Sequence, residues 1–135
     1  MNTVLLIAHA PLASALRAGA LHVFPDAGDA VLALDISPHE PPEDSLAAAR
    51  ALLATAPAAR SVLLLTDVLG ATPSNVAQRL AADAGAAPLP LLAGVNLPML
   101  LRALCYRAEP LAAMTERALA GGTQGIVRVA AAPTP

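Results

Sequence analysis

The N-terminal stretch of the chain reads Thr3-Val4-Leu5-Leu6-Ile7-Ala8-His9-Ala10-Pro11-Leu12. Its apolar run has the length of a strand, and a run without polar alternation is typical of a strand buried on both faces of a parallel sheet. The run stops at His9, and Pro11 then opens a helical pattern. This position matters because ligands of open α/β sheets gather at the carboxyl ends of the strands.

The alternation of strand and helix continues along the whole chain. We predict strands over residues 3–8, 30–34, 61–66 and 89–93. We predict helices over 11–23, 97–106 and 110–120, and two further helices that begin at residue 43 and at Thr72-Pro73. Right-handed crossovers then predict an α/β fold: a doubly wound open sheet of four parallel strands in the order 2-1-3-4, with helices on both faces. A fifth strand is expected over residues 125–130, after Gly121-Gly122 stop the last helix. We expect one domain over residues 1–130 and a disordered tail over 131–135.

The composition fits a folded domain and excludes several classes of function. The chain has 135 residues, of which 56% are hydrophobic and 13% charged, so it can bury a core rather than stay disordered. Its eight basic residues are scattered and leave no footprint for nucleic acid. The single cysteine suits a reducing compartment, and neither a secretory signal nor an apolar run of membrane-helix length is found. We therefore expect a cytoplasmic protein.

The predicted topology brings the end of the third strand beside His9. The sequence there is Thr66-Asp67-Val68-Leu69-Gly70-Ala71-Thr72-Pro73-Ser74. Asp67 is expected next to His9, where a carboxylate that accepts a hydrogen bond from one ring nitrogen leaves the other free as a nucleophile or base. The N–H groups of Gly70, Ala71 and Thr72, with the hydroxyls of Thr72 and Ser74, predict an anion site at the start of the next helix. This combination suggests phosphoryl transfer through a phosphohistidine.

Each of these features also has a purely structural interpretation. A strand-end histidine is often a satisfied, partly buried residue, Asp67 could cap a turn, and Thr72-Pro73 could be the N-cap and first residue of a helix. His22 falls near a helix end, where a structural role is the simpler interpretation. His39 lies in a proline-rich loop and could approach the site from the second strand, although a solvated loop histidine is again simpler. No two histidines have metal-ligand spacing, so we expect no metal and no cofactor.

Three blocks of sequence carry a resemblance to a known family. They are Leu6-Ile7-Ala8-His9, residues 64–73, and Gly94-Val95-Asn96-Leu97-Pro98-Met99-Leu100. They resemble the mannose/fructose-type enzyme IIA component of the bacterial phosphoenolpyruvate-dependent sugar phosphotransferase system, and the similarity runs from Val4 to about Val129. Where that family usually has glycine this chain has Ala10 and Ala71. Ala71 bears on the anion site, because a position with positive φ would favour glycine.

The resemblance implies a phosphoryl carrier. His9 would accept a phosphoryl group from phospho-HPr on Nε2 and pass it to a histidine of an enzyme IIB, while Asp67 holds Nδ1–H. It further implies a homodimer that exchanges the last strand, and association with a membrane permease only through the enzyme IIB. The residues expected to bind the phosphoryl group are Gly70, Ala71, Thr72 and Ser74, and those expected on the rim that partners contact are Thr66, Leu69, Asn96 and Met99.

The residues leave other functions open. The same phosphorylation could be read by a regulated protein partner rather than passed to a sugar permease, and the chain could also be the phosphoryl-donor subunit of dihydroxyacetone kinase. A hydrolase that uses His9 and Asp67 as a base pair is less favoured, because no serine or cysteine lies in a Gly-x-Ser-x-Gly context.

Overall fold

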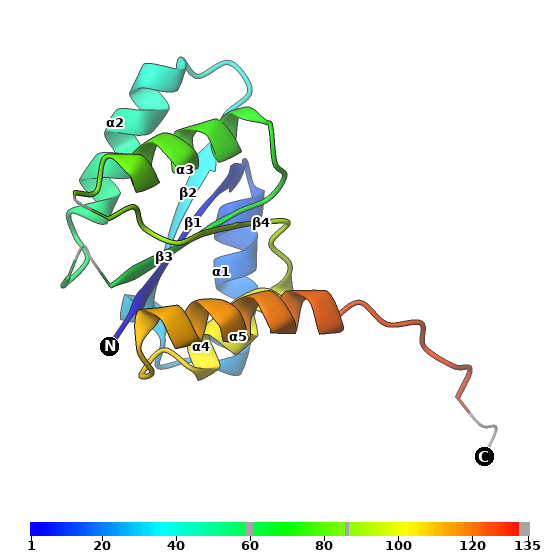
Figure 1. The fold of residues 1–135 in the computed structure, drawn as a ribbon. Helices are drawn as coiled ribbons and strands as arrows, with labels where there is room; N and C mark the ends of the chain where they lie inside the picture. The colour runs from blue at the N-terminus through cyan, green and yellow to red at the C-terminus, as the bar shows by residue number, and fades with distance from the viewer. Residues whose placement is uncertain (59–60, 86, 133–135) are drawn as a thin grey trace.

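A parallel sheet forms the centre of the molecule (Figure 1). The computed structural model describes residues 1–58, 61–85 and 87–132. The strands are β1 (Thr3–His9), β2 (Val31–Ile36), β3 (Val62–Thr66) and β4 (Leu91–Ala93), in the order β2-β1-β3-β4 that the sequence predicted. In the pairing of β1 with β3, Ile7 lies beside Thr66, so the carboxyl ends of the two central strands meet at one edge.

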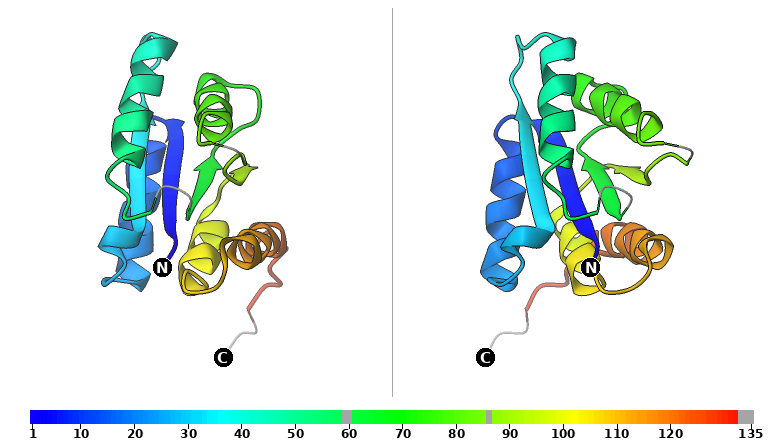
Figure 2. Two further views of the ribbon diagram at one scale, coloured as in Figure 1. Left: turned by 60° about the vertical axis from the view of Figure 1, so that its left-hand side comes forward. Right: turned by 90° about the vertical axis from the view of Figure 1, so that its left-hand side faces the viewer.

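Helices cover both faces of the sheet, as predicted. On one face lie α1 (Leu12–Val23), α4 (Leu97–Cys105) and α5 (Leu111–Gln124), and on the other lie α2 (Pro42–Leu53) and α3 (Thr72–Ala82). Figure 2 shows α2 and α3 side by side in both views, and likewise α4 and α5. None of the helices in the described ranges combines the length and the hydropathy that crossing a bilayer would require.

Successive side chains of β1 point to opposite faces of the sheet, and this alternation decides which helices lie near its last residue. Val4, Leu6 and Ala8 pack with α1, α4 and α5, whereas Leu5 and Ile7 pack with α2 and α3. All five are fully buried, because both faces of the strand are covered. The next residue in the second series is His9, whose side chain therefore falls on the side of α2 and α3.

Helix α3 begins one residue earlier than the sequence predicted. Ala71 is the N-cap and keeps an extended backbone, with φ −88° and ψ 171°, and Thr72 is already the first helical residue. The predicted N-cap role of Thr72 is therefore wrong, and no side chain caps this helix. The N–H groups of its first turn are thus left for water or a ligand.

Helix α5 runs through the glycines that were expected to stop it. It ends only at Gln124, because Gly121-Gly122 face α4 at close range. A Cβ on Gly121 would lie 2.5 Å from the Cβ of Arg102, and a Cβ on Gly125 would overlap that of Pro98 in the same way. Tertiary packing here overrides the low helix propensity of glycine.

A substitution at Gly121 tests this contact. We expect Gly121→Ala to lower the free energy of unfolding by about 1–3 kcal/mol, because Arg102 must move its backbone to accommodate the methyl group. The matched control is Gly19→Ala in α1, where the new Cβ would meet Leu97 at an ordinary 3.6 Å. That variant should gain about 0.5–1 kcal/mol. Urea titrations measure both, and equal stabilities for the two variants would contradict the close-packing explanation.

The fifth strand is not formed in this single chain. Residues 125–132 leave α5 without regular secondary structure, and Figure 1 shows them leading away from the body of the molecule. Ile126, Val127 and Val129 are 78%, 69% and 82% exposed. A strand needs a neighbouring strand for its hydrogen bonds, and within the described residues this segment pairs with none of β1 to β4. Of the tail predicted over 131–135, residues 133–135 lie outside the described ranges.

Candidate functional site

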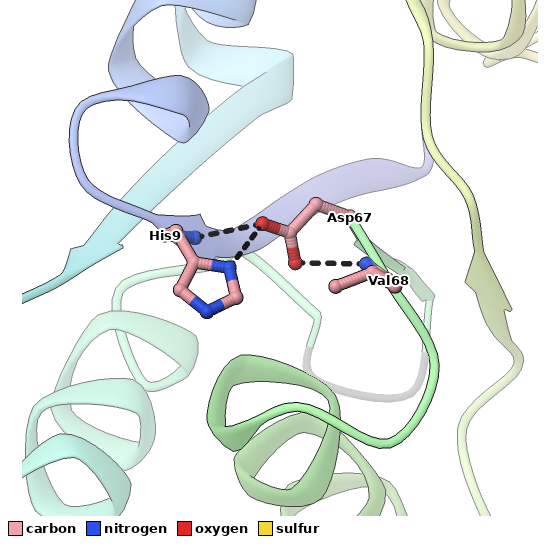
Figure 3. Close-up of polar contacts among 3 residues, drawn as sticks. All are labelled: His9, Asp67 and Val68. Carbon is pink, nitrogen blue, oxygen red and sulfur yellow. Dashed lines mark hydrogen bonds and ion pairs between the residues drawn. The ribbon is translucent and has the colours of Figure 1, made fainter. Parts of the chain in front are cut away.

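His9 and Asp67 form a hydrogen-bonded pair at the carboxyl edge of the sheet (Figure 3). One carboxylate oxygen of Asp67, Oδ2, lies 3.0 Å from the backbone nitrogen of His9 and 2.6 Å from Nδ1 of its ring. Because both contacts reach the same oxygen from the same residue, they fix the orientation of the imidazole relative to its own backbone. The contact predicted from the strand order is therefore present.

The surroundings of Asp67 keep it ionised. Burial alone would raise the pKa of Asp67, but hydrogen bonds from the backbone and ring of His9 and from the N–H of Val68, 2.9 Å from Oδ1, outweigh it. The net effect lowers the pKa below its ordinary value. The resulting stabilisation is present above the unfolded-state pKa of the carboxyl and is lost as the pH falls through the lower folded-state pKa.

The ionised carboxylate decides which ring nitrogen is free. A carboxylate without a proton can only accept hydrogen bonds, so Nδ1 of His9 carries the hydrogen. In the neutral ring, Nε2 then keeps its lone pair. Figure 3 shows this second nitrogen directed away from Asp67. The His9 side chain is half exposed, whereas that of Asp67 is 10% exposed. The pair therefore leaves one nucleophilic ring nitrogen accessible, while the carboxylate that orients the ring is mostly buried.

The exposed ring opens into a groove between two helix N-termini. The groove has a volume of about 540 Å³ and is lined by His9, the loop over residues 37–41, Pro42 of α2, and Thr72 and Pro73 of α3. Helix N-termini carry partial positive charge and unpaired N–H groups, which favour an anion. Within the described residues, no group of three His, Cys, Asp or Glu side chains is arranged to hold a metal ion.

The loop after β3 accommodates alanine at position 71 without strain. The residue with positive φ is Gly70, at +91°, whereas Ala71 has a φ of −88° that any residue adopts. The glycine that the family usually has at position 71 is therefore not required by the backbone here. Gly70 is exposed, and a Cβ there would meet nothing within 4 Å. The positive φ of this residue, and not a lack of space for a side chain, therefore explains why glycine is found here.

Several residues expected at the site lie elsewhere. Ser74 is fully buried and its Oγ accepts a hydrogen bond from Gln78 at 3.4 Å, so its hydroxyl is not offered to the groove. Thr66 is fully buried on the sheet, and Met99 is buried on the side of α4 that packs against α5, so neither forms part of an accessible rim. Leu69, in contrast, is 71% exposed beside Val68, which is 51% exposed.

Asn96, expected on the rim, has a structural role at the start of α4. Its Oδ1 accepts the N–H of Met99 at 2.9 Å as the N-cap of α4, and its Nδ2 donates to the carbonyl of Gly122 at 3.1 Å. Asn is a preferred N-cap, and its place immediately before Leu97-Pro98 was the signal available in the sequence. The side chain thus ties the start of α4 to α5.

Comparison with known proteins shows the family of this chain. A sequence profile described as the PTS system fructose IIA component matches residues 3–119. No curated protein sequence is significantly similar to the chain. Among solved structures, the mannose/sorbose specific IIA subunit of the phosphotransferase system from Enterococcus faecalis superposes with a TM-score of 0.84, at 21% identity over 99% of this chain and 98% of that chain.

Two further structures share the fold. The phosphotransferase system component EIIA from Streptococcus agalactiae has a TM-score of 0.79 at 24% identity, covering 95% of this chain and 97% of its own. A sigma-54 interaction domain protein from Enterococcus faecalis has a TM-score of 0.75 at 13% identity, covering 92% of each chain. Identities this low show the fold alone, whereas the profile spans most of the sequence. The chain therefore belongs to the family of fructose-type IIA components of the sugar phosphotransferase system.

Proposed function

We propose that this protein is a cytoplasmic phosphoryl carrier, which accepts a phosphoryl group from phospho-HPr on Nε2 of His9 and passes it to an enzyme IIB. The observation that carries the proposal is the His9–Asp67 pair, with Nδ1 held at 2.6 Å and Nε2 open to a groove between the starts of α2 and α3. Family membership supplies the class of chemistry, and the pair supplies the atom that performs it.

The transfer exchanges one nitrogen–phosphorus bond for another. The bond from phosphorus to the donor imidazole breaks as the bond to Nε2 of His9 forms, and no proton needs to be added or removed in that exchange. Positive charge that develops on the His9 ring is balanced by the carboxylate of Asp67 at Nδ1. The protein contributes mainly the position of the reacting atoms and the balance of charge, which account for most of the catalysis in phosphoryl transfer.

The phosphoryl oxygens would lie against the start of α3. The donors at this helix start are the N–H groups of Ala71 and Thr72 and the hydroxyl of Thr72, and Thr72 is exposed and lines the groove. Gly70 lets the chain turn into this helix. Ser74 is left out of the cradle because it is buried.

The function is tested by labelling. Incubation with labelled phosphoenolpyruvate, enzyme I and HPr should give a phosphoprotein that is labile to acid and stable to base, as expected for a phosphohistidine. Adding an enzyme IIB of the same family should then discharge it. A protein that takes no label in the presence of active HPr would contradict the proposal. Label that forms but passes to no enzyme IIB would favour instead a regulatory protein or a phosphoryl donor to dihydroxyacetone kinase.

The exposed pair Val68 and Leu69 would contact these partners. Both lie directly after Asp67, and their apolar side chains are more than half exposed. We expect Leu69→Asp to raise the KM for phospho-HPr about tenfold, the effect of losing a central apolar interface contact, with no change in melting temperature. Val23→Asp, at an exposed apolar position near the other end of α1, is the matched control and should leave the KM unchanged. Equal values of KM for both variants would place the docking surface elsewhere.

The apolar segment after α5 supports a homodimer. We infer that residues 126–130 pair as a strand with the sheet of a second copy, because Ile126, Val127 and Val129 are exposed and, within the described residues, β2 and β4 each have one unpaired edge. A chain that ends at Gly125 should therefore be a monomer at concentrations where the full chain is a dimer. A chain that lacks only residues 131–135 serves as the control and should remain dimeric. Sedimentation equilibrium distinguishes them, and a monomeric full chain would overturn the inference.

A further inference from the structure

The groove in front of His9 contains a second histidine. His39 belongs to the loop between β2 and α2, and both residues line the same cavity of about 540 Å³, although they are 30 positions apart in the sequence. His39 is exposed, so its ring is available to a group that enters the groove. The two histidines approach this cavity from neighbouring elements, since β1 and β2 end side by side with His9 paired to Ile36.

The loop that carries His39 is braced on both sides. The N–H of Glu40 donates to the carbonyl of Ser37 at 3.2 Å, which closes a turn with His39 inside it. The carboxylate of Glu40 accepts a hydrogen bond from Ser45, a fully buried residue of α2. Prolines at 38, 41 and 42 restrict the backbone on either side. The ring of His39 is therefore presented from a restrained turn and not from a free loop.

The charged residues around this groove are mostly acidic, so an anion that enters it has few positively charged side chains to bind. Among the residues that line it, the titratable ones are His9, His39 and Glu40, and neither lysine nor arginine is present. Three further carboxylates belong to residues next to this lining in structure or sequence: Asp67, which is bonded to His9, and Glu43 and Asp44 in the first turn of α2, directly after Pro42. A phosphoryl group brings a charge of about −1.5 to −2 into these acidic surroundings.

The arginines of α2 and α3 are already engaged, and Arg50 of α2 lies 2.5 Å from Asp83. Arg79 of α3 lines a separate cavity between α2 and α3 and lies 3.5 Å from Asp83. Histidine is the side chain that gains a positive charge near physiological pH, and protonation makes both ring nitrogens donors. Apart from His9, which would carry the phosphoryl group, His39 is the one residue among those lining the groove whose side chain can bear a positive charge.

We propose that His39 is the second histidine of the site and that its protonated ring donates a hydrogen bond to the phosphoryl oxygens carried by His9. This inference rests on the proposed phosphoryl-carrier function and names a phosphoryl-binding residue for it. His39 forms no bond to phosphorus. It stabilises the phosphorylated state relative to the free one, most strongly where imidazole is protonated.

The test measures the phosphoryl equilibrium between HPr and this protein at pH 6 and pH 8.5. We expect His39→Gln to lower the ratio of labelled protein to labelled HPr roughly threefold at pH 6, the size of an exposed charge pair, and to leave it unchanged at pH 8.5. His39→Lys keeps a positive charge at both values and should raise the ratio at pH 8.5. The matched control is His22→Gln, an exposed histidine near the far end of α1, which should equal the wild type throughout.

A spectroscopic readout separates this role from a structural one. The NMR signals of the His39 ring should shift when His9 is phosphorylated, and those of His22 should not. If the wild type takes no label, the carrier function and this inference both fail. If the wild type is labelled but His39→Gln behaves as His22→Gln at pH 6, or the His39 signals do not move, only this inference is overturned.

Discussion

Replacing His9 by glutamine should abolish phosphoryl labelling from phosphoenolpyruvate, enzyme I and HPr. Glutamine fills much of the volume of histidine and its side-chain amide can still bond Asp67, but it has no nucleophilic nitrogen to attack phosphorus. Because the ring of His9 is half exposed at the end of β1, the fold should tolerate the change. We expect a loss to background, which by order of magnitude exceeds a thousandfold for removal of a nucleophile.

Two other histidines provide the internal comparison for this result. His22→Gln should be labelled as fully as the wild type, and His39→Gln should still be labelled under conditions in which the donor is in excess. Mass spectrometry of the wild-type phosphoprotein should locate the group on His9. Full labelling of His9→Gln with an unchanged stoichiometry would show that another residue carries the phosphoryl group.

Removal of the Asp67 carboxylate should slow phosphoryl acceptance by about a hundredfold or more, which is the range for a carboxylate that orients a catalytic histidine. In Asp67→Ala the backbone N–H and ring of His9 and the N–H of Val68 lose their shared acceptor. The imidazole can then rotate, and its hydrogen can move to Nε2, where it blocks attack. Rapid-quench labelling measures the rate.

The asparagine variant separates charge from orientation. In Asp67→Asn one carboxylate oxygen is replaced by an NH₂ group, which donates hydrogen bonds and cannot accept them. Either the N–H of Val68 or the N–H groups of His9 would then face another donor instead of an acceptor. We expect its rate to fall between those of the wild type and Asp67→Ala. The control is Asp35→Asn, because Asp35 is also a carboxylate near a strand end but bonds Ser14 of α1 and not His9. The role of Asp67 would be contradicted if Asp67→Ala accepted the phosphoryl group as fast as the wild type. It would also be contradicted if Asp35→Asn accepted it as slowly as the Asp67 variants while keeping the same melting temperature.

The strand order and the His9–Asp67 contact could be predicted from local sequence because a parallel sheet of this kind has few possible strand orders. Right-handed crossovers and fully apolar first and third strands leave those strands adjacent, and their carboxyl ends then meet whatever the side chains are. A contact between residues 58 positions apart could thus be predicted without any long-range signal. The roles of these residues in transfer remain predictions for the experiments above.

Other features depended on packing that no local pattern reports. Gly121-Gly122 have the composition of a helix end, and only the approach of α4 explains why they lie inside α5. Ser74 and Met99 were expected at the site from their neighbours in sequence, yet the helical turn directs both into the core. The strand expected over 125–130 has the right residues but is paired with no strand among the described residues of this single chain.

The contact of α4 with α5 also has a consequence for how this sequence can change over time. Gly121 and Gly125 approach Arg102 and Pro98 so closely that neither side of the contact can gain volume alone. Among relatives that keep this helix pair, a larger residue at either glycine position should coincide with a smaller residue, or a displaced backbone, at the opposing position on α4. Such paired exchange would appear in an alignment as inverse size covariation, far from the histidine that performs the chemistry.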